Sequence, residues 1–542
     1  MNSILSGILF IIIFTISTCK TIDNKSSIST VESAENDSPP PCLAVPSIIS
    51  NSMMIQQNKP IRIWGRAPLS SNIKVKIIRY SDDKTVVEGQ AISSGRSGDW
   101  LVTLPELRGG FTTYRIEISD QTKKITIDDV LVGEVWMNGG QSNMELQVRY
   151  TVEASTLMSE AKYPYIRLFI EDHISKAMYD NVSPRPLWNV SNGYWRTAKD
   201  GDGISNSSAI GYSFARYLYL YLKDKGKEVP VGMMSTATGS TSIAAWIGRK
   251  TLESDPELMA LLPPAWQYKA TQQMPDPYFQ PTACYNHKIA PLQNLNIRGI
   301  IWAQGEANAG PEKTANLYKK QLLALMGQWR EDFRDVNMPF LIAELPPYAI
   351  SCETPEILDQ YAFIREAQFD ASEKEKFSYA LPVYDIDRSW DFGKFAYTHP
   401  VHTLIKRPIG ERLAAAALQM AYGFPMEYSG PKFKSLTFRS GKAVVLFSNV
   451  AAGLKIKNGD RVLSGFAIAG RDRNFTKANA LISAPDSVTV FSPDVPEPVA
   501  VTYAFTAMNQ SANLMNSLNL PTQPFRSDRI KSNYLRIRPT FI

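Results

Sequence analysis

An apolar run from Ile127 to Trp136 leads into two glycines, Gly139 and Gly140, and then a serine, Ser142. Apolar residues on both faces are typical of a central strand in a parallel sheet, because helices cover both faces of such a sheet. Glycines after the strand permit a sharp turn, which holds the next side chain out at the carboxyl edge. The segment predicts a buried strand that ends at a serine held out at the carboxyl edge of the sheet, and an ordinary glycine-serine turn is the simpler alternative.

The chain from 127 to 424 alternates between strand-like and helix-like segments. Buried strands are expected at 229–234, 297–302, 340–345 and 379–384, and helices at 210–223, 315–333 and 409–422. This alternation is typical of a parallel sheet with helices on both faces, which is a three-layer α/β/α domain. Ligands of such domains bind outside the carboxyl ends of the strands.

Short strands with alternating apolar and polar residues dominate both flanks of this α/β domain. Residues 43–126 are predicted to form an N-terminal β-sandwich domain, and residues 425–542 a C-terminal β domain. Residues 20–42 are rich in Ser, Asn, Asp, Glu and Pro, so we expect a linker there.

The first 19 residues are predicted to be an export signal. Ile4 to Ile16 is apolar, too short for a typical membrane span, and small polar residues follow it. The residues before Cys19 loosely resemble a lipoprotein cleavage box, so a lipid anchor on Cys19 is the alternative to a plain signal peptide. We therefore expect a secreted, periplasmic or lipid-anchored protein whose only membrane contact would be that anchor.

Composition argues against two classes of function. The net charge of +6 is spread along the chain without a dense Lys/Arg cluster, which gives nucleic-acid binding little support. The chain has four cysteines, no CxxC pair and four histidines, so a cysteine-rich zinc site is not expected. One disulfide among Cys42, Cys284 and Cys352 is compatible with an oxidising compartment, and the sequence does not choose the pair.

Two further polar clusters follow predicted strands. Gly239 lies in a small-residue turn, where a backbone N–H without a neighbouring Cβ could meet a developing oxyanion. After the next strand, Gln304 or Asn308 could donate a side-chain amide to the same oxyanion, and Glu306 could orient the loop. A flexible loop at Gly239 and helix capping at Glu306 and Asn308 are the structural alternatives.

A fourth cluster holds His399 and His402, before the predicted helix at 409–422. A serine is a poor nucleophile at neutral pH unless a base accepts its proton, and histidine titrates in the useful range. Three acids lie upstream and could fix the imidazole tautomer: Asp385, Asp387 and Asp391.

The order Ser, Gly, Asn/Gln, His at successive strand ends resembles the blocks of an SGNH-type hydrolase. The segments GEVWMNGGQSNM, GSTSIAAW, YNHKIAPL and IIWAQGEANA are similar to the sialate O-acetylesterase family of carbohydrate acetylesterases, in family order, and the resemblance covers residues 44–528. The resemblance implies an SGNH-hydrolase fold for the α/β domain and Ser142 as the nucleophile.

The resemblance also implies site residues around Ser142. Gly239 and Asn308, together with the Ser142 backbone N–H, would line the oxyanion hole, with Gln304 as the alternative donor. The substrate-binding residues implied beside the nucleophile are Gln141, Asn143 and Glu306.

The histidine block departs from the family pattern, which reads Asp, one residue, His, Pro. The segment VHTLIKRPIGERLA aligns without gaps if His402 is the base, but Pro400 then replaces the acid. His399 keeps the His-Pro pair and requires an insertion. Catalysis would then rely either on a Ser–His dyad without an acid, or on one of the upstream aspartates as the acid partner of the histidine.

The function expected from these features is hydrolysis of O-acetyl esters on sugars through an acetyl-enzyme, without a metal or organic cofactor. O-acetylated sialic acid is the substrate that the resemblance implies. Acetylated xylan or another plant polysaccharide is one alternative, and an exported carbohydrate-binding protein with a decayed active site is another.

Overall fold

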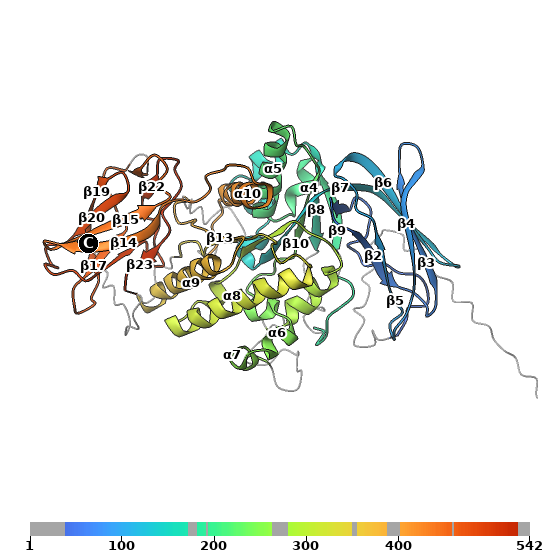
Figure 1. Cartoon of the computed structure of the whole chain (residues 1–542), viewed down its shortest axis with the longest axis horizontal. Helices are drawn as coiled ribbons and strands as arrows, with labels where there is room; N and C mark the ends of the chain where they lie inside the picture. The colour runs from blue at the N-terminus through green and yellow to red at the C-terminus, as the bar shows by residue number, and fades with distance from the viewer. Residues whose placement is uncertain are drawn as a thin grey trace, which may run out of the picture.

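The computed structural model describes residues 38–171, 182–190, 193–262, 280–348, 355–386, 401–457 and 460–528. An α/β domain occupies the centre, with one β domain on each side of it (Figure 1). The N-terminal β domain lies at the right of that view and the C-terminal one at the left.

The central sheet has the strand order β13-β12-β11-β7-β10-β8-β9. The strands are β7 (Lys124–Gly140), β8 (Tyr163–Glu171), β9 (Gly193–Ala198), β10 (Val231–Ser235), β11 (Gly299–Ala303), β12 (Phe340–Ala343) and β13 (Ser378–Leu381). All neighbours are parallel except β9, which pairs antiparallel with β8 at the edge. The predicted parallel sheet is thus confirmed for its centre, and the antiparallel edge strand is an addition to it.

Helices cover both faces of this sheet, as the alternating sequence pattern predicts (Figure 1). One face is covered by α5 (Ala209–Asp224) and α10 (Arg407–Tyr422), and the other by α8 (Glu312–Asp332) and α9 (Pro355–Lys374). Successive strand residues face different cores: Trp136 packs in the core with α5 and α10, and Met137 in the core with α8. This alternation produces two apolar cores around one sheet, which is the three-layer α/β/α arrangement.

Strand β7 belongs to two sheets. Its first half pairs antiparallel with β6 (Gly110–Ser119), and its second half pairs with β10 and β11 in the centre of the α/β domain. Between them, β1 (Met54–Gln56) runs parallel to Leu131–Gly133. The domain boundary predicted between residues 126 and 127 therefore falls within one continuous strand of 17 residues.

The remaining strands of the N-terminal domain pair with one another or with β6. They are β2 (Ile61–Arg66), β3 (Asn72–Arg79), β4 (Lys84–Ile92) and β5 (Asp99–Leu104). Strand β3 lies between β4 and β6, and β2 pairs antiparallel with β5. The alternating apolar pattern of these segments thus gives mainly antiparallel pairs, as expected.

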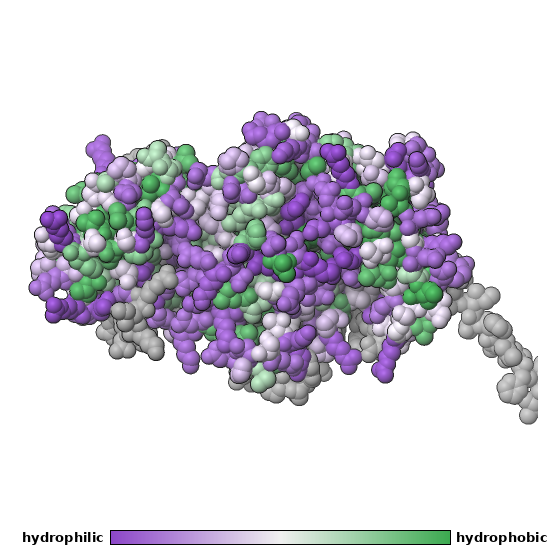
Figure 2. All heavy atoms as spheres, viewed as in Figure 1, coloured by the Kyte–Doolittle hydropathy of each residue, from purple (hydrophilic) through white to green (hydrophobic). Residues whose placement is uncertain are grey.

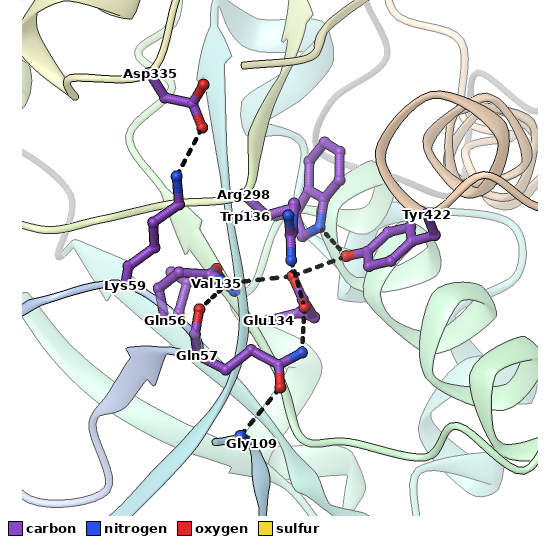
Figure 3. A network of polar contacts seen from close by, with 10 residues as sticks. All are labelled: Gln56, Gln57, Lys59, Gly109, Glu134, Val135, Trp136, Arg298, Asp335 and Tyr422. Carbon is purple, nitrogen blue, oxygen red and sulfur yellow. Dashed lines mark hydrogen bonds and ion pairs between the residues drawn. The ribbon is translucent and has the colours of Figure 1, made fainter. Parts of the chain in front are cut away.

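A buried carboxylate, Glu134, joins the N-terminal domain to the central sheet (Figure 3). Arg298 donates to both carboxylate oxygens, at 2.7 and 3.0 Å, and Gln57 and the Tyr422 hydroxyl also donate to it. Burial opposes ionisation of Glu134, but the hydrogen bonds and charge of Arg298 hold its pKa below the usual value. The network ties together β1, β7, the residue before β11 and the end of α10.

The C-terminal β domain follows α10 and has its own apolar core. Its strands are β14 (Lys432–Arg439), β15 (Lys442–Ser448), β16 (Leu454–Ile456), β17 (Phe466–Ala469), β18 (Thr476–Lys477), β19 (Asn479–Ala484), β20 (Ser487–Phe491), β21 (Ala500–Tyr503), β22 (Leu514–Asn516) and β23 (Phe525–Arg526). Hydrophilic residues cover much of the visible face of the molecule, between small apolar patches (Figure 2). Within the residues described here, no helix combines the length and apolar character needed to cross a membrane.

Candidate active site

The serine turn is built by a glycine that no other residue could replace without displacing a neighbouring strand. Gly140 ends β7 with φ +128°, and a Cβ on it would lie 2.1 Å from the carbonyl oxygen of Ala303 on β11. The Gln141 N–H donates to that same oxygen at 2.9 Å. Ser142 then starts the short helix α1 (Ser142–Glu145) and is half-buried at the carboxyl edge of the central strand. This is the position that the sequence predicts for the serine.

Gly239 lies directly beside Ser142. The Thr238 N–H donates to the Gly140 carbonyl at 3.0 Å, which fixes the turn after β10 against the end of β7. A Cβ on Gly239 would be 3.6 Å from the Ser142 Cβ. The Gly239 N–H donates to Oε2 of Glu145 at 2.7 Å. A backbone N–H donor therefore lies next to Ser142, and in this structure it donates to the Glu145 carboxylate.

The two amide candidates after β11 have different surroundings. Gln304 is 1 % exposed, and its Nε2 donates to Oδ1 of Asn308 at 2.8 Å and to the Thr241 carbonyl at 3.0 Å. Asn308 is half-buried, and its Oδ1 also accepts from the Ile243 N–H. Because this oxygen accepts both bonds, the Asn308 NH₂ group is turned away from Gln304. The Gln304 amide donates to groups of the surrounding loops. The geometry therefore favours Asn308 over Gln304 as the donor to a ligand.

Asn143 connects the serine turn to the histidine segment. Its Nδ2 donates to Glu306 and to the Val401 carbonyl at 3.0 Å, and its Oδ1 accepts from Lys406 Nζ at 2.6 Å. Lys406 is 0 % exposed. Both Asn143 and Glu306 were predicted to bind substrate, but the contacts of their side chains are with protein groups. Burial raises the pKa of Glu306, while the hydrogen bond from Asn143 and the charge of Lys406 oppose that rise.

His402 lies in this anchored segment. It is half-buried and directly follows Val401, whose carbonyl is bound by Asn143. Further along, the Leu404 carbonyl accepts from the Val152 N–H at 3.1 Å, so the segment is fixed on both sides of the histidine. His399, Asp387 and Asp391 lie outside the described residues.

Asp385 follows β13 and forms a two-pronged ion pair. Arg412 on α10 donates to Oδ1 at 2.8 Å and to Oδ2 at 2.6 Å, and the aspartate is 8 % exposed. Both oxygens are therefore engaged in fastening β13 to α10. This arrangement gives Asp385 a structural role and leaves the acid partner of the histidine open.

Glu145 and a buried ion pair near it were not predicted from the sequence. Lys288, in the short π-helix at 285–289, forms a salt bridge with Glu171 at the end of β8, and both side chains are buried. Burial raises the pKa of Glu171, Lys288 opposes this, and the charge of Glu145 adds to it. The charged residues in the segments SNMEL (142–146) and YNHKI (285–289) were the sequence features that could have indicated these buried groups. Among the described residues, no group of three or more His, Cys, Asp or Glu side chains is arranged to hold a metal ion.

Comparisons with known proteins show the family of the chain. Residues 132–380 match the family described as carbohydrate esterase, sialic acid-specific acetylesterase. The sialate O-acetylesterase of Rattus norvegicus is 25% identical over 434 residues, covering 72% of this chain and 76% of the relative. The human sialate O-acetylesterase is 24% identical over 416 residues, covering 71% of this chain and 72% of the relative.

A solved structure resembles almost the whole molecule. The crystal structure of a carbohydrate acetylesterase from Xanthomonas citri is 30% identical, with a TM-score of 0.75. The match covers 90% of this chain and 100% of that one, so it includes both β domains as well as the sheet between them. By its sequence and its fold, the chain belongs to the carbohydrate esterase family of sialic acid-specific acetylesterases, which makes it a hydrolase of carboxylic esters.

Proposed function

We propose that this protein removes O-acetyl groups from sugars with Ser142 as the nucleophile and a histidine of the 399–402 segment as the base. The Ser142 oxygen attacks the acetyl carbon while the imidazole takes the serine proton. The sugar oxygen then leaves with that proton, and an acetyl-serine ester remains. Water, deprotonated by the same imidazole, attacks the ester, and acetate departs as the serine is regenerated.

The observation that carries this proposal is the backbone N–H of Gly239 beside Ser142. A donor in that place can bind the carbonyl oxygen as it gains negative charge, and one such donor is worth about 10²–10³ in kcat. The Glu145 carboxylate must leave the Gly239 N–H for this to happen. The Ser142 N–H and the Asn308 amide are the other donors that we assign to the oxyanion.

His402 is the base that we favour over His399. Asn143 immediately follows the nucleophile and binds the carbonyl of the residue that immediately precedes His402. Displacement of the segment around His402 is therefore resisted by the turn that carries Ser142. Because Asp385 is bound to Arg412, we propose that catalysis uses a Ser–His pair. If an acid orients the histidine, we assign that role to Asp387 or Asp391.

The substrate class that we propose is an O-acetylated sugar, with O-acetylated sialic acid as the first to test, because the curated relatives are sialate O-acetylesterases. Acetylated xylan is the alternative that we propose, and the structural relative is a carbohydrate acetylesterase. We also propose export, from the apolar segment at residues 4–16.

Turnover of p-nitrophenyl acetate by the wild type and Ser142→Ala tests the serine mechanism. The wild type should show a burst and steady turnover, and Ser142→Ala should lose at least about a thousandfold in kcat. If both proteins are equally inert on the ester and on acetylated sugars, the protein is a carbohydrate-binding protein with a decayed site. Acetate release from acetylated sialic acids and acetylated xylan then identifies the substrate.

His399→Ala and His402→Ala form a matched pair that identifies the base. We expect His402→Ala to lose about a thousandfold or more in kcat, and His399→Ala to lose far less. The reverse ranking would assign the base to His399. Small and equal losses would show that neither histidine accepts the serine proton.

A further inference from the structure

A cavity lies between the N-terminal β domain and the α/β domain. Its volume is about 430 Å³, and its walls come from β2, β4 and β5 on one side and from residues 290–294 on the other. Ile92 and Leu101 at its border are 66% and 43% exposed, so the cavity opens to solvent as a groove. None of the described residues that line it belongs to the Ser142 site.

Tryptophan and polar side chains line this groove together. Trp64 and Trp100 form its buried wall, and Trp188 is half-buried at its side. Asp99 and Asn294 line the same space. An aromatic ring offers an apolar face to the C–H groups of a ligand, while a carboxylate and an amide bind its hydroxyl groups. This combination, in a groove of this size, fits a polar ligand that has an apolar face.

Trp188 is held in place by both of its neighbours. The Leu187 N–H donates to the Asn286 carbonyl at 2.9 Å, and the Asn189 side chain accepts from the Ser47 N–H at 2.8 Å. These bonds fasten the tryptophan to the α/β domain on one side and to the N-terminal segment on the other. A residue whose backbone is held on both sides before binding loses less conformational entropy when a ligand stacks on its ring.

The aspartate of the groove is paired with an arginine. Arg66 lies over the Trp188 ring, 5.2 Å from its centroid, and its Nε donates to Asp99 Oδ1 at 2.8 Å. The Asp99 side chain is 61% exposed, so its second oxygen is available to a ligand hydroxyl. Among the described residues at the groove, the aspartate is thus paired with an arginine, which favours an uncharged ligand.

We propose that this groove is a binding subsite for an uncharged sugar unit, separate from the Ser142 site. This inference rests on the proposed function in one respect: an enzyme that deacetylates a glycan chain can hold the chain at a second place. The sugar ring packs on Trp188, and its hydroxyl groups bind Asp99 and Asn294.

Affinity electrophoresis of the full chain in native gels tests the subsite, with xylan, glucomannan and hydroxyethyl cellulose as the immobilised probes. We expect at least one polymer to retard the wild type, and Trp188→Ala to raise the apparent dissociation constant by about tenfold or more. Trp188→Phe keeps an aromatic face and should keep most of the retardation. Tyr80→Ala is the control, because Tyr80 is a 61% exposed aromatic residue of the N-terminal β domain and lies outside the groove.

Retardation does not depend on turnover, so it separates this inference from the proposed function. Ser142→Ala should be retarded like the wild type, whatever its activity on p-nitrophenyl acetate. Thermal melting of each variant shows whether it is folded. The subsite proposal is overturned if no polymer retards the wild type, or if folded Trp188→Ala is retarded as strongly as the wild type and Tyr80→Ala.

Discussion

Replacing Lys406 with methionine tests whether the buried network around Asn143 positions the catalytic base. Methionine is nearly as long as lysine and fills the same space, but it cannot donate to Asn143. The lost bond comes from a charged donor, so its removal is worth about 1.5–3 kcal/mol. Asn143 would then hold the Val401 carbonyl less firmly, and His402 follows Val401 directly.

Two effects of Lys406→Met can be separated. A displaced base should lower kcat for p-nitrophenyl acetate by up to about a hundredfold, because misplacement by about 1 Å is that costly. The second effect is on the pKa of Glu306. Burial raises this pKa, and the charge of Lys406 opposes the rise. Without the ammonium group, that pKa rises further above 4.5. An acid whose folded-state pKa is raised stabilises the fold below its unfolded pKa, and this stability is lost as pH rises through the folded value.

The assay is urea unfolding, followed by tryptophan fluorescence at several pH values from 5 to 8, together with kcat at each pH. The unfolding midpoint of Lys406→Met should fall more steeply with pH than that of the wild type. Adding Glu306→Gln should remove the extra slope, because the glutamine does not titrate. An unchanged unfolding midpoint, together with a kcat within twofold of that of the wild type, would refute the positioning role. An extra slope that persists in the double variant would refute the assignment to Glu306.

Three other variants give independent checks. Glu145→Gln replaces the carboxylate that accepts from the Gly239 N–H with a weaker, uncharged acceptor. Because a negative charge beside the oxyanion is removed, kcat/KM for p-nitrophenyl acetate should rise by about threefold to tenfold. An unchanged value would mean that the carboxylate does not compete with the oxyanion for this N–H. Burial raises the pKa of Glu344 to about 7, so wild-type stability should fall between pH 4.5 and 7, and Glu344→Gln should flatten that part of the melting-temperature profile. Glu134→Gln breaks the buried pair with Arg298 and should cost about 3 kcal/mol of stability in urea unfolding, and a cost below about 1 kcal/mol would contradict the central role of this carboxylate.

The sequence predicted the parts of the fold that depend on local pattern. Apolar runs marked β7, β10, β11 and β12, and the periodic segments marked α5, α8 and α10, because burial on two faces or on one stripe leaves a direct trace in residue order. Gly140 was found for the same reason, since a turn that excludes a Cβ selects glycine.

The parts that the sequence did not predict depend on contacts between distant segments. The domain boundary at 126/127 followed a change of pattern along the chain, but hydrogen bonding continues through β7 on both sides of it. Likewise, nothing local indicates that Asp385 pairs with Arg412, or that Lys406 reaches Asn143 across more than 260 positions. The local sequence around Glu145 also does not indicate that its carboxylate accepts a hydrogen bond from the Gly239 N–H.

The continuity of β7 limits how this protein can be divided. A protease or an expression boundary near residue 126 would cut through the strand that ends at the nucleophile, and it would remove the partners that Glu134 finds on β1. The esterase part is therefore not a detachable module, although its sequence pattern suggests one. A shorter version of the enzyme would have to keep the N-terminal sheet, and a hinge between the two would have to bend a paired strand.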